Sequence, residues 1–535
     1  MYKVIDLFAG AGGLSLGFEQ TRKYEIKVAF ENNITAQETY KKNHPNTEVL
    51  DDVCDADYEK LKKKYGKIDI VIGGPPCQGF SNANRQKNYA INKNNMLLKQ
   101  YIRAIIELQP DAFVMENVSM LTSHVHRFYM EHSDKKIVEE YKIPTEYAKI
   151  FLLNERYKFN GAKHIIQSPL ALQHYIWTPE IYATINIAYK QNRNINKLKD
   201  ILEKHKKTFT ALCSKIAVSG DSPICLMNEN LCSAFLKYYS GIFQPQDLIN
   251  AIEPPIMIQR MLGRAKEILD NNLLVDHYSD SNDIVAHIKS FAISDYLNKI
   301  LSSTKHGYVV DSGVLCAADF GAPQKRMRFV LMGVKSNINS QIALPKGHIE
   351  TDKYFTVYDA ISDLEKEPPI MKSSNTGQKF LYTPSIISPL ASQLRDSNVL
   401  YNHIITNSSN IALERFKVIK QGQNFHSLSE EMKKNTYTDS SRTQNTIYLR
   451  LSYFKPSGTV VNVRKSMWIH PIHNRAISVR EAARLQTFPD SFIFTGSKDA
   501  QYQQVGNAVP PMLAKAIAEK LYCVLQKTSR ENCNG

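Results

Sequence analysis

No apolar run in the 535-residue sequence approaches the roughly 20 residues that a helix needs to cross a bilayer. Met1 to Asp6 lead straight into a strand-like segment, without the basic flank and apolar core of a secretory signal. Hydrophobic residues make up 43% and charged residues 22%, which is typical of a folded globular chain rather than a disordered one. We therefore expect an intracellular protein.

The eight cysteines include no Cys-x-x-Cys pair. Cys213, Cys225 and Cys232 also lack the spacing of a zinc site, so we expect no metal ion. Without a secretory signal the thiols are expected to be free. Seven of the eight are interpreted as ordinary small residues, and Cys77 is the exception because of the segment in which it lies.

Acidic residues are outnumbered: 52 Asp and Glu stand against 67 Lys and Arg, a net charge of +15. Such a surplus favours a polyanionic partner, because each phosphate that a cation neutralises releases a counterion. Charge alone does not identify nucleic acid, since many basic proteins bind none. There is no internal repeat or low-complexity block, and the length predicts two to three folding units of roughly 150 residues each.

Short apolar runs alternate with helix-length segments over residues 1–120. The predicted strands are 4–8, 26–30, 68–72 and 112–115, and the predicted helices are about 13–19, 35–43 and 97–108. Glycine-containing turns follow the first and third of these strands. This alternation predicts a parallel sheet with helices on both faces, which is the α/β class.

The remainder of the chain changes character three times. Residues 125–290 are nearly free of glycine punctuation and carry Lys, Tyr, Ile and Leu at helical spacing, which predicts a mostly helical segment. Strand signals return at 308–310 and 328–332, and residues 336–450 are irregular, as in a small loop-rich domain. Helices are predicted at 478–486, where Ser478 and Glu481 form a capping box, and at 511–526.

A glycine cluster, Gly10-Ala11-Gly12-Gly13, follows the first predicted strand and opens a helix. Glycines there let the backbone approach a ligand at the carboxyl edge of a parallel sheet. Glu31 ends the second strand about 20 residues further on, where a carboxylate can bind both hydroxyls of a ribose. The pattern predicts an adenosine-containing cofactor, although a tight turn without a ligand would use the same glycines. Ser15 stands near the place of the third glycine of a dinucleotide fingerprint.

Three other segments carry candidate chemistry. Cys77 follows Gly-Gly-Pro-Pro just past a strand, where local amide dipoles can favour a thiolate, and a structural loop cysteine is the alternative. Glu116 ends the strand 112–115 and is a candidate acid. Arg326 and Arg328 alternate and so lie on one face of a strand, although a surface ion pair would also explain them. A glycine turn at Gly506-Asn507 leads into the last predicted helix.

In their order along the chain, these segments resemble the motifs of the DNA (cytosine-5) methyltransferase family of the bacterial restriction–modification type. The resemblance covers about residues 1–120, 305–335 and 450–525. The resembling segments are Asp6 to Gly13, Glu31, Asp52, Pro76-Cys77-Gln78, Glu116-Asn117-Val118, Gln324 to Arg328, Arg480 to Gln486 with Phe488-Pro489-Asp490, and Gly506-Asn507.

The resemblance implies a Rossmann-like S-adenosylmethionine-dependent methyltransferase domain with a helical insertion and a small loop-rich target-recognition domain. The implied catalytic domain takes residues 1–124 and 291–335, the insertion 125–290 and the recognition domain 336–450. Residues 451–535 complete the recognition domain and return to the catalytic domain.

The resemblance also implies a reaction in which Cys77 adds to C6 of a flipped-out cytosine, so that C5 can attack the methyl group of S-adenosylmethionine. Glu116 is then expected to bond to N3 and the exocyclic amine. Arg326 and Arg328 are expected to support the base and nearby phosphates. The loop from Asn82 to Asn95 is placed to close over DNA.

Two sets of binding residues follow from the resemblance. The recognition domain is expected to contact the major groove. The expected cofactor contacts are Phe8, Gly10, Gly12, Gly13, Glu31, Asp52, Pro76, Leu97 and Asn507. The expected DNA contacts are Gln78, Ser81, Arg85, Gln324, Arg442 and Arg450, with Lys433 and Lys434 as further candidates.

The stretch between Glu116 and Gln324 is much longer than in compact members of the family. We expect it to decorate the fold or to contact DNA, rather than to be a second enzyme. By analogy, the protein is expected to be a cytoplasmic, bacterial, monomeric modification enzyme that acts separately from a cognate restriction endonuclease. The alternatives are a transfer-RNA cytosine-5 methyltransferase and a catalytically silent DNA-binding regulator. The usual RNA enzymes carry a second cysteine where Glu116 and Asn117 stand here.

Overall fold

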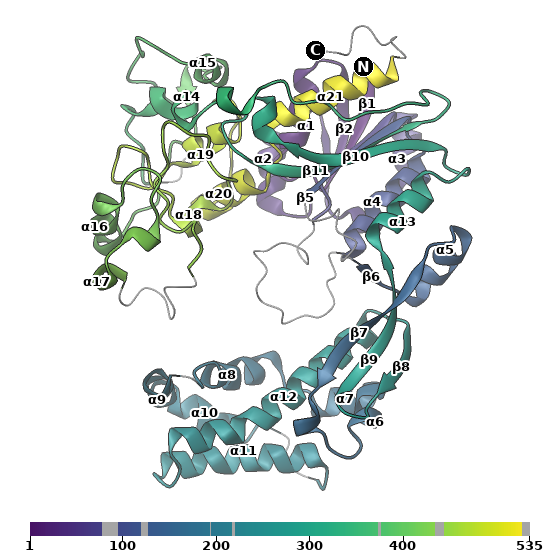
Figure 1. Cartoon of the computed structure of the whole chain (residues 1–535), viewed down its shortest axis with the longest axis vertical. Helices are drawn as coiled ribbons and strands as arrows, with labels where there is room; N and C mark the ends of the chain where they lie inside the picture. Colours follow the sequence, from purple (N-terminus) through teal and green to yellow (C-terminus); the bar gives the residue numbers. More distant parts are fainter. Residues whose placement is uncertain are drawn as a thin grey trace. The chain divides into compact units, whose positions relative to one another are not determined.

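A computed structural model describes residues 1–76, 95–118, 127–192, 194–216, 220–372, 376–433 and 443–526. The chain forms two compact units, and Figure 1 labels their elements. The large unit takes Met1–Ser81, Asn94–Ser123 and Ile300–Gly535. The insertion unit takes Asn82–Lys93 and His124–Lys299.

The large unit is built on a seven-stranded sheet with the order β10-β11-β5-β4-β1-β2-β3. The five strands from β5 to β3 are parallel, as predicted, whereas β11 runs antiparallel to both β5 and β10. A short connection suffices between antiparallel strands, but a parallel pair needs a crossover. The strands are β1 Tyr2–Leu7, β2 Tyr24–Phe30, β3 Glu48–Leu50, β4 Ile70–Gly73, β5 Ala112–Val118, β10 Tyr308–Cys316 and β11 Met327–Lys335.

Helices cover both faces of this sheet, as predicted. Ile70 and Ile72 of β4 lie in one apolar cluster with Leu513 of the last helix. On the opposite face, a Cβ added at Gly73 would lie 3.1 Å from the ring of Tyr101, which places α4 there. The helices of this layer structure are α1 Gly13–Gln20, α2 Ile34–Asn43, α3 Tyr58–Tyr65, α4 Asn95–Leu108 and α21 Pro511–Leu525.

Residues 336–450 are loop-rich, as predicted, but neither they nor the chain as far as 510 separate from the large unit. Ala11 of the glycine loop shares one apolar cluster with Val357 and Trp468. The predicted capping box of Ser478 and Glu481 is present. Gly506 lies in the last turn of a helix, so the expected glycine turn was wrong. The elements are α14 Val357–Ile361, α15 Pro389–Leu394, α16 Asn410–Val418, α17 Glu430–Lys433, α18 Val463–Ser466, α19 Val479–Leu485, α20 Lys498–Asn507, β12 Gln378–Lys379 and β13 Val399–Leu400.

The insertion unit is mostly helical, as predicted for residues 125–290, but it also contains a sheet that was not predicted. Its two ends form a four-stranded antiparallel sheet of β6 Arg127–Tyr129, β7 Thr145–Leu153, β8 Val275–Ser279 and β9 Ile284–Ala292. β9 alternates buried and partly exposed residues with the period of a strand. The helices are α5 Lys135–Glu140, α6 Ala162–Gln167, α7 Pro169–Tyr175, α8 Pro179–Tyr189, α9 Ile195–Lys204, α10 Lys206–Leu212, α11 Pro223–Tyr239, α12 Pro245–Asp270 and α13 Ile293–Leu301. No helix within the described ranges is long and apolar enough to cross a membrane.

Candidate active site at the carboxyl edge of the sheet

The carboxyl ends of β1, β2 and β3 bring three expected cofactor residues to one edge. Phe8 follows β1, Glu31 follows β2 and Asp52 lies just past β3. Neighbouring parallel strands end on the same side, which is where ligands bind in open α/β sheets. All three residues are partly exposed.

Glu31 is tied to the glycine loop. Its Oε2 accepts a hydrogen bond of 2.8 Å from the backbone N–H of Gly10, and its Oε1 accepts one of 2.8 Å from Asn33. Burial raises the pKa of Glu31, and these two N–H groups oppose the rise. Gly10 has a φ of +57°, and a Cβ added there would meet nothing within 4 Å. The loop therefore borders open space beside a carboxylate, which fits an adenosine-containing cofactor.

Gly12 and Gly13 lie in close contact with other parts of the protein. A Cβ at Gly12 would lie 2.3 Å from Nε2 of His44, and one at Gly13 would lie 2.4 Å from the carbonyl oxygen of Val509. Both glycines are buried. Both glycines are therefore needed for the loop to pack against α2 and the chain before α21, and their contact with the cofactor stays a prediction.

Val509 brings the closing motif to the same loop. Asn507 is exposed at the end of α20, and its Oδ1 accepts a hydrogen bond of 2.7 Å from Gln503. Leu97 is half-buried in the first turn of α4. Asn507 thus lies two residues before Val509, whose carbonyl packs against the glycine loop.

Asn117 connects β5 to the segment that precedes the expected nucleophile. Its buried side chain donates a hydrogen bond of 2.9 Å to the carbonyl of Pro75. Pro76, the next residue, is half-buried. Cys77 lies outside the described residues, and so do the expected DNA contacts Gln78, Ser81, Arg85 and Arg442.

Glu116 lies within β5 rather than beyond its end, next to the same segment. A Cβ added at Gly74 would be 3.2 Å from Oε2 of Glu116. Arg328 of β11 forms an ion pair with it, 2.7 Å from Nε to Oε1, and the two side chains are 13% and 11% exposed. Burial raises the pKa of Glu116, while Arg328 and Arg326 counteract that rise. The arrangement is a shielded carboxyl group that retains a proton more readily than an ordinary glutamate.

Arg326 does not reach a surface where it could contact phosphates. It is 1% exposed, and it donates hydrogen bonds of 2.7 Å to the carbonyl of Val460 and 3.0 Å to that of Gly506. The expected phosphate contact is therefore corrected. Arg326 ties the start of β11 to α20, and its charge acts on Glu116.

The expectation that Gln324 contacts DNA is likewise wrong, because its side chain is fully buried. It donates hydrogen bonds to the carbonyl of Leu485 at 2.8 Å and to the side chain of Gln486 at 2.6 Å. Its oxygen accepts a hydrogen bond of 3.1 Å from the backbone of Val460. A side chain satisfied in this way has no remaining group for DNA.

The expectation that Arg450 contacts DNA is also wrong, because this side chain is buried. It is 4% exposed and donates to the carbonyls of Ile419 at 2.6 Å and His470 at 2.8 Å, and also to that of Phe416. It therefore holds loops of the recognition segment together. Lys433 forms an ion pair of 2.9 Å with Glu430, in which the lysine side chain is only 15% exposed, and Lys434 lies outside the described residues.

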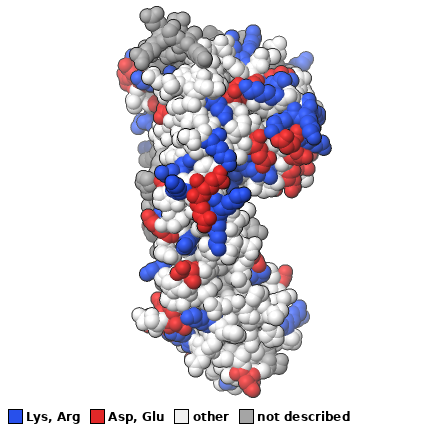
Figure 2. Space-filling view, turned by 90° about the vertical axis from the view of Figure 1, so that its right-hand side faces the viewer, with Lys and Arg blue, Asp and Glu red and all other residues white. Residues whose placement is uncertain are grey.

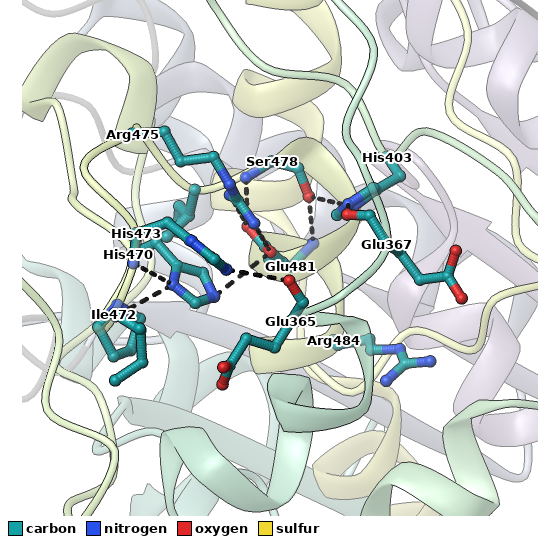
Figure 3. A network of polar contacts seen from close by, with 12 residues as sticks. Glu365, Glu367, His403, His470, Ile472, His473, Arg475, Ser478, Glu481 and Arg484 are labelled. Atoms are coloured by element: carbon teal, nitrogen blue, oxygen red, sulfur yellow. Dashed lines mark hydrogen bonds and ion pairs between the residues drawn. The ribbon is translucent and has the colours of Figure 1, made fainter. Parts of the chain in front are cut away.

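The sequence did not predict a buried polar network around α19, which is drawn in Figure 3. Glu481 is fully buried and accepts hydrogen bonds of 2.8 and 2.7 Å from the Arg475 guanidinium and one of 2.7 Å from the N–H of Ser478. Nε2 of His470 lies 3.7 Å from Glu481, while its Nδ1 accepts from the N–H groups of Ile472 and His473. Burial is the main reason that the pKa of His470 falls to about 3, so the ring is neutral.

The network matters to the site because Leu485, the last residue of α19, and Gln486, the next residue, hold Gln324. The capping box was the part of it that a local pattern could reveal. Arg475 and His470 gave no such signal, because their roles depend on partners brought together by the fold.

Residues 2–142 and 285–523 match the family model described as C-5 cytosine-specific DNA methylase. The type II methyltransferase M.DdeI of Desulfomicrobium norvegicum is 25% identical, over 97% of this chain and 88% of that protein. The type II methyltransferase M1.HphI of Haemophilus parahaemolyticus is 26% identical, over 96% and 85%.

Among solved structures, a DNA modification methyltransferase encoded within a prophage of E. coli matches with a TM-score of 0.55 and 21% identity, over 98% of this chain and 100% of that one. This likeness shows the fold. The family model covers well over half of the chain, including the glycine loop, Glu116 and the arginine strand. The chain therefore belongs to the C-5 cytosine-specific DNA methylase family, and its activity is methylation of cytosine at C5 in DNA.

Proposed function

We propose that the chain methylates cytosine within a specific sequence of double-stranded DNA, with S-adenosylmethionine as the methyl donor and Cys77 as the nucleophile. The observation that carries the proposal is the shielded pair of Glu116 and Arg328 next to Gly74, three residues before Cys77. A pyrimidine ring that a thiolate attacks needs a neighbouring acid, and a carboxyl group with a raised pKa meets that need.

Glu31 and Gly10 would hold the cofactor, with Asp52 on the neighbouring strand. When bound there, S-adenosylmethionine supplies an activated methyl group. The carboxylate of Glu31 is fixed by two backbone N–H groups, so its position does not depend on the ligand. The open space beside Gly10 gives the room that the ligand requires.

The chain's own residues then act on the base. The thiolate of Cys77 forms a bond to C6, which makes C5 nucleophilic. Glu116 donates a hydrogen bond to N3 as negative charge develops in the ring, and Arg328 fixes the orientation of Glu116. After C5 has gained the methyl group, a base removes the C5 proton and Cys77 is expelled. The target must leave the base stack for this attack, so base flipping is part of the proposal.

We also infer that the protein is the modification enzyme of a type II restriction–modification pair in a bacterial cytoplasm and acts as a monomer. The support is its alignment along most of the length of M.DdeI and M1.HphI. A cognate endonuclease would be a separate chain. The inference predicts that a neighbouring gene encodes an endonuclease whose cleavage is blocked by this methylation, and cleavage of methylated DNA would refute it.

Covalent trapping tests the chemistry. The protein is incubated with S-adenosylmethionine and DNA duplexes that contain 5-fluorocytosine in varied contexts, and a denaturation-stable adduct is sought. The expected result is an adduct that the Cys77→Ser variant does not form. Absence of any adduct on duplex DNA, with S-adenosylmethionine still bound, would refute the proposal. An adduct on fluorinated transfer RNA instead would identify an RNA enzyme, and none on either would identify a silent DNA-binding protein.

A further inference from the structure

The insertion unit contains a segment that the family model does not account for, since residues 143–284 fall between the two matched ranges. The chain's surplus of positive charge is unevenly distributed. On the face drawn in Figure 2, basic and acidic side chains are interspersed.

Residues 190–215 contain eight Lys and Arg against two acidic residues, Asp200 and Glu203, which gives a net charge of +6. The rest of His124–Lys299 has 14 basic and 17 acidic residues. The positive charge of the insertion unit is therefore concentrated in α9 and α10 and the residues that flank them.

The fold holds these lysines in solvent. Leu198 and Leu202 of α9 and Phe209 and Leu212 of α10 are buried in one apolar cluster with residues of α8, α11 and α12. This packing fixes the two helices with their opposite sides outward. Seven lysines of α9, α10 and their flanking residues are exposed, and we call this set the lysine surface; its members are Lys190, Lys197, Lys199, Lys204, Lys206, Lys207 and Lys215. Asp200 and Glu203 are also exposed on α9.

The amines of the lysine surface lie outside ion-pairing distance of the acidic side chains of the described residues, Asp200 and Glu203 included. Within the described part of the chain, none of its seven members takes part in an ion pair, whereas Lys163 and Lys266 of the same unit pair with Asp280 and Asp270. Lys206 lies over the ring of Tyr239, at 5.2 Å from its centre. An amine without a carboxylate partner needs to break no ion pair before it binds a phosphate.

We propose that the lysine surface binds the phosphate backbone of double-stranded DNA without sequence preference. Lysine is a compact charge on a flexible stem and contacts phosphates without reading bases. Such contacts release counterions and increase the time that the enzyme spends on DNA between target sites. The inference rests on the proposed function only in taking DNA as the polyanion.

The test compares two variants with equal charge change. The lysine-surface variant carries Lys197→Gln, Lys199→Gln, Lys206→Gln and Lys207→Gln. The matched control changes four exposed lysines elsewhere in the insertion unit, namely Lys135, Lys136, Lys237 and Lys266, to Gln. Thermal unfolding of both should match the unsubstituted protein, because none of these side chains is buried.

The measurement is the affinity for a random-sequence DNA duplex as a function of salt. Each phosphate contact contributes about 0.9 to the slope of log K against log salt concentration. We expect the lysine-surface variant to lose a slope of about 2 to 4 and to bind at least about tenfold more weakly at low salt, while the control changes little. An unchanged slope, or an equal loss in both variants, would overturn the inference.

Methyl transfer separates this inference from the proposed function. With labelled S-adenosylmethionine and saturating unmethylated bacterial DNA, both variants should keep the unsubstituted kcat, and the lysine-surface variant should show a raised KM for DNA. A fall in kcat confined to the lysine-surface variant would overturn the inference, because it would place these lysines in the catalytic steps. If the unsubstituted protein transferred no methyl group, the proposed function would fail, yet the salt slopes would still decide the role of the lysine surface.

Discussion

Two opposing influences act on the pKa of the Glu116 carboxyl group. Its side chain is 11% exposed, and burial disfavours its ionised form, while the nearby guanidinium of Arg328 favours it. The raised pKa of Glu116 shows that burial is the stronger influence. A donor to the pyrimidine ring therefore remains available at a pH where an exposed glutamate would have lost its proton.

Replacing Glu116 tests that role. The Glu116→Gln variant keeps a polar group of the same size but cannot transfer a proton, so kcat for methyl transfer should fall by about 10² or more. The unsubstituted enzyme should lose kcat as pH rises through the raised pKa of Glu116, and this limb should be missing from the profile of the variant. A variant with normal kcat and the same pH limb would contradict the assignment.

The two glycines of the loop give a matched pair of variants. Gly10→Ala meets no neighbour but retains a left-handed φ, at a cost of about 1–2 kcal/mol, so its main effect should be a raised KM for S-adenosylmethionine. Gly12→Ala collides with His44 and should lower the melting temperature more. Thermal melts and cofactor titrations of both variants decide the matter. Equal effects on cofactor binding and on stability would contradict the distinction.

At the scale of elements, α19 is the helix on which buried charges converge. Glu481 accepts from Arg475, and Arg484 pairs with Asp490 at 2.6 Å and also with Asp363. Burial alone would raise the pKa of Glu481, but Arg475 holds it well below its usual range. Removing one partner of such a pair leaves an uncompensated buried charge.

The Glu481→Gln variant should therefore be destabilised by roughly 3–5 kcal/mol. The reason is that Arg475 would lose its counter-charge inside the protein. Urea unfolding measures the effect, with Lys417→Gln as a control in which only the exposed ion pair with Glu414 is broken and little change is expected. A small effect of Glu481→Gln would mean that water or another group replaces the carboxylate.

The same network makes the fold sensitive to acid. His470 has a pKa of about 3 instead of 6.5, so the unfolded chain binds a proton between these values that the folded chain does not. Stability present above pH 6.5 is thus lost as pH falls, by about 1.4 kcal/mol per pH unit for each such proton. The pKa of His403 is also lowered, mainly by burial, and adds to this loss. His470→Asn should have a shallower dependence of unfolding free energy on pH between 6.5 and 4, and an unchanged slope would exclude His470 as a source.

On the scale of the whole molecule, the two ends of the chain share one core. Leu513, Ile517 and Leu521 of α21 are fully buried in the cluster that includes Val4 of β1. Tyr24 of β2 donates a hydrogen bond of 2.7 Å to the carbonyl of Ala518. The core of the large unit is therefore complete only when the last helix has docked.

The Ile517→Ala variant tests this closure. Loss of a fully buried isoleucine should cost about 2–5 kcal/mol and lower the denaturant midpoint. Glu519→Ala on the exposed side of the same helix is the control and should have little effect. Equal stability of the two variants would mean that α21 is not part of the cooperative core.

Local patterns were sufficient for much of the fold and the site. Four of the five strands in the first 120 residues contain short, mainly apolar runs, and the capping box of α19 spans four residues, so each could be predicted without its neighbours. The three-residue strand β3 was not predicted. β7 and β9 were missed because more than 100 residues separate the paired strands and helices lie between them. The antiparallel direction of β11 was missed for a related reason, since direction is a property of a pair and not of a strand.

The sequence by itself determined the family, the order of the motifs, and Glu31 and Glu116 as candidate residues, because these depend on residue type and spacing. Only the tertiary structure decided which polar side chains are available. Gln324, Arg326 and Arg450 resemble surface groups in the sequence, yet carbonyls from distant segments enclose them. The physical reason is that burying a polar side chain is costly without hydrogen-bond partners, and those partners come together only when the chain has folded.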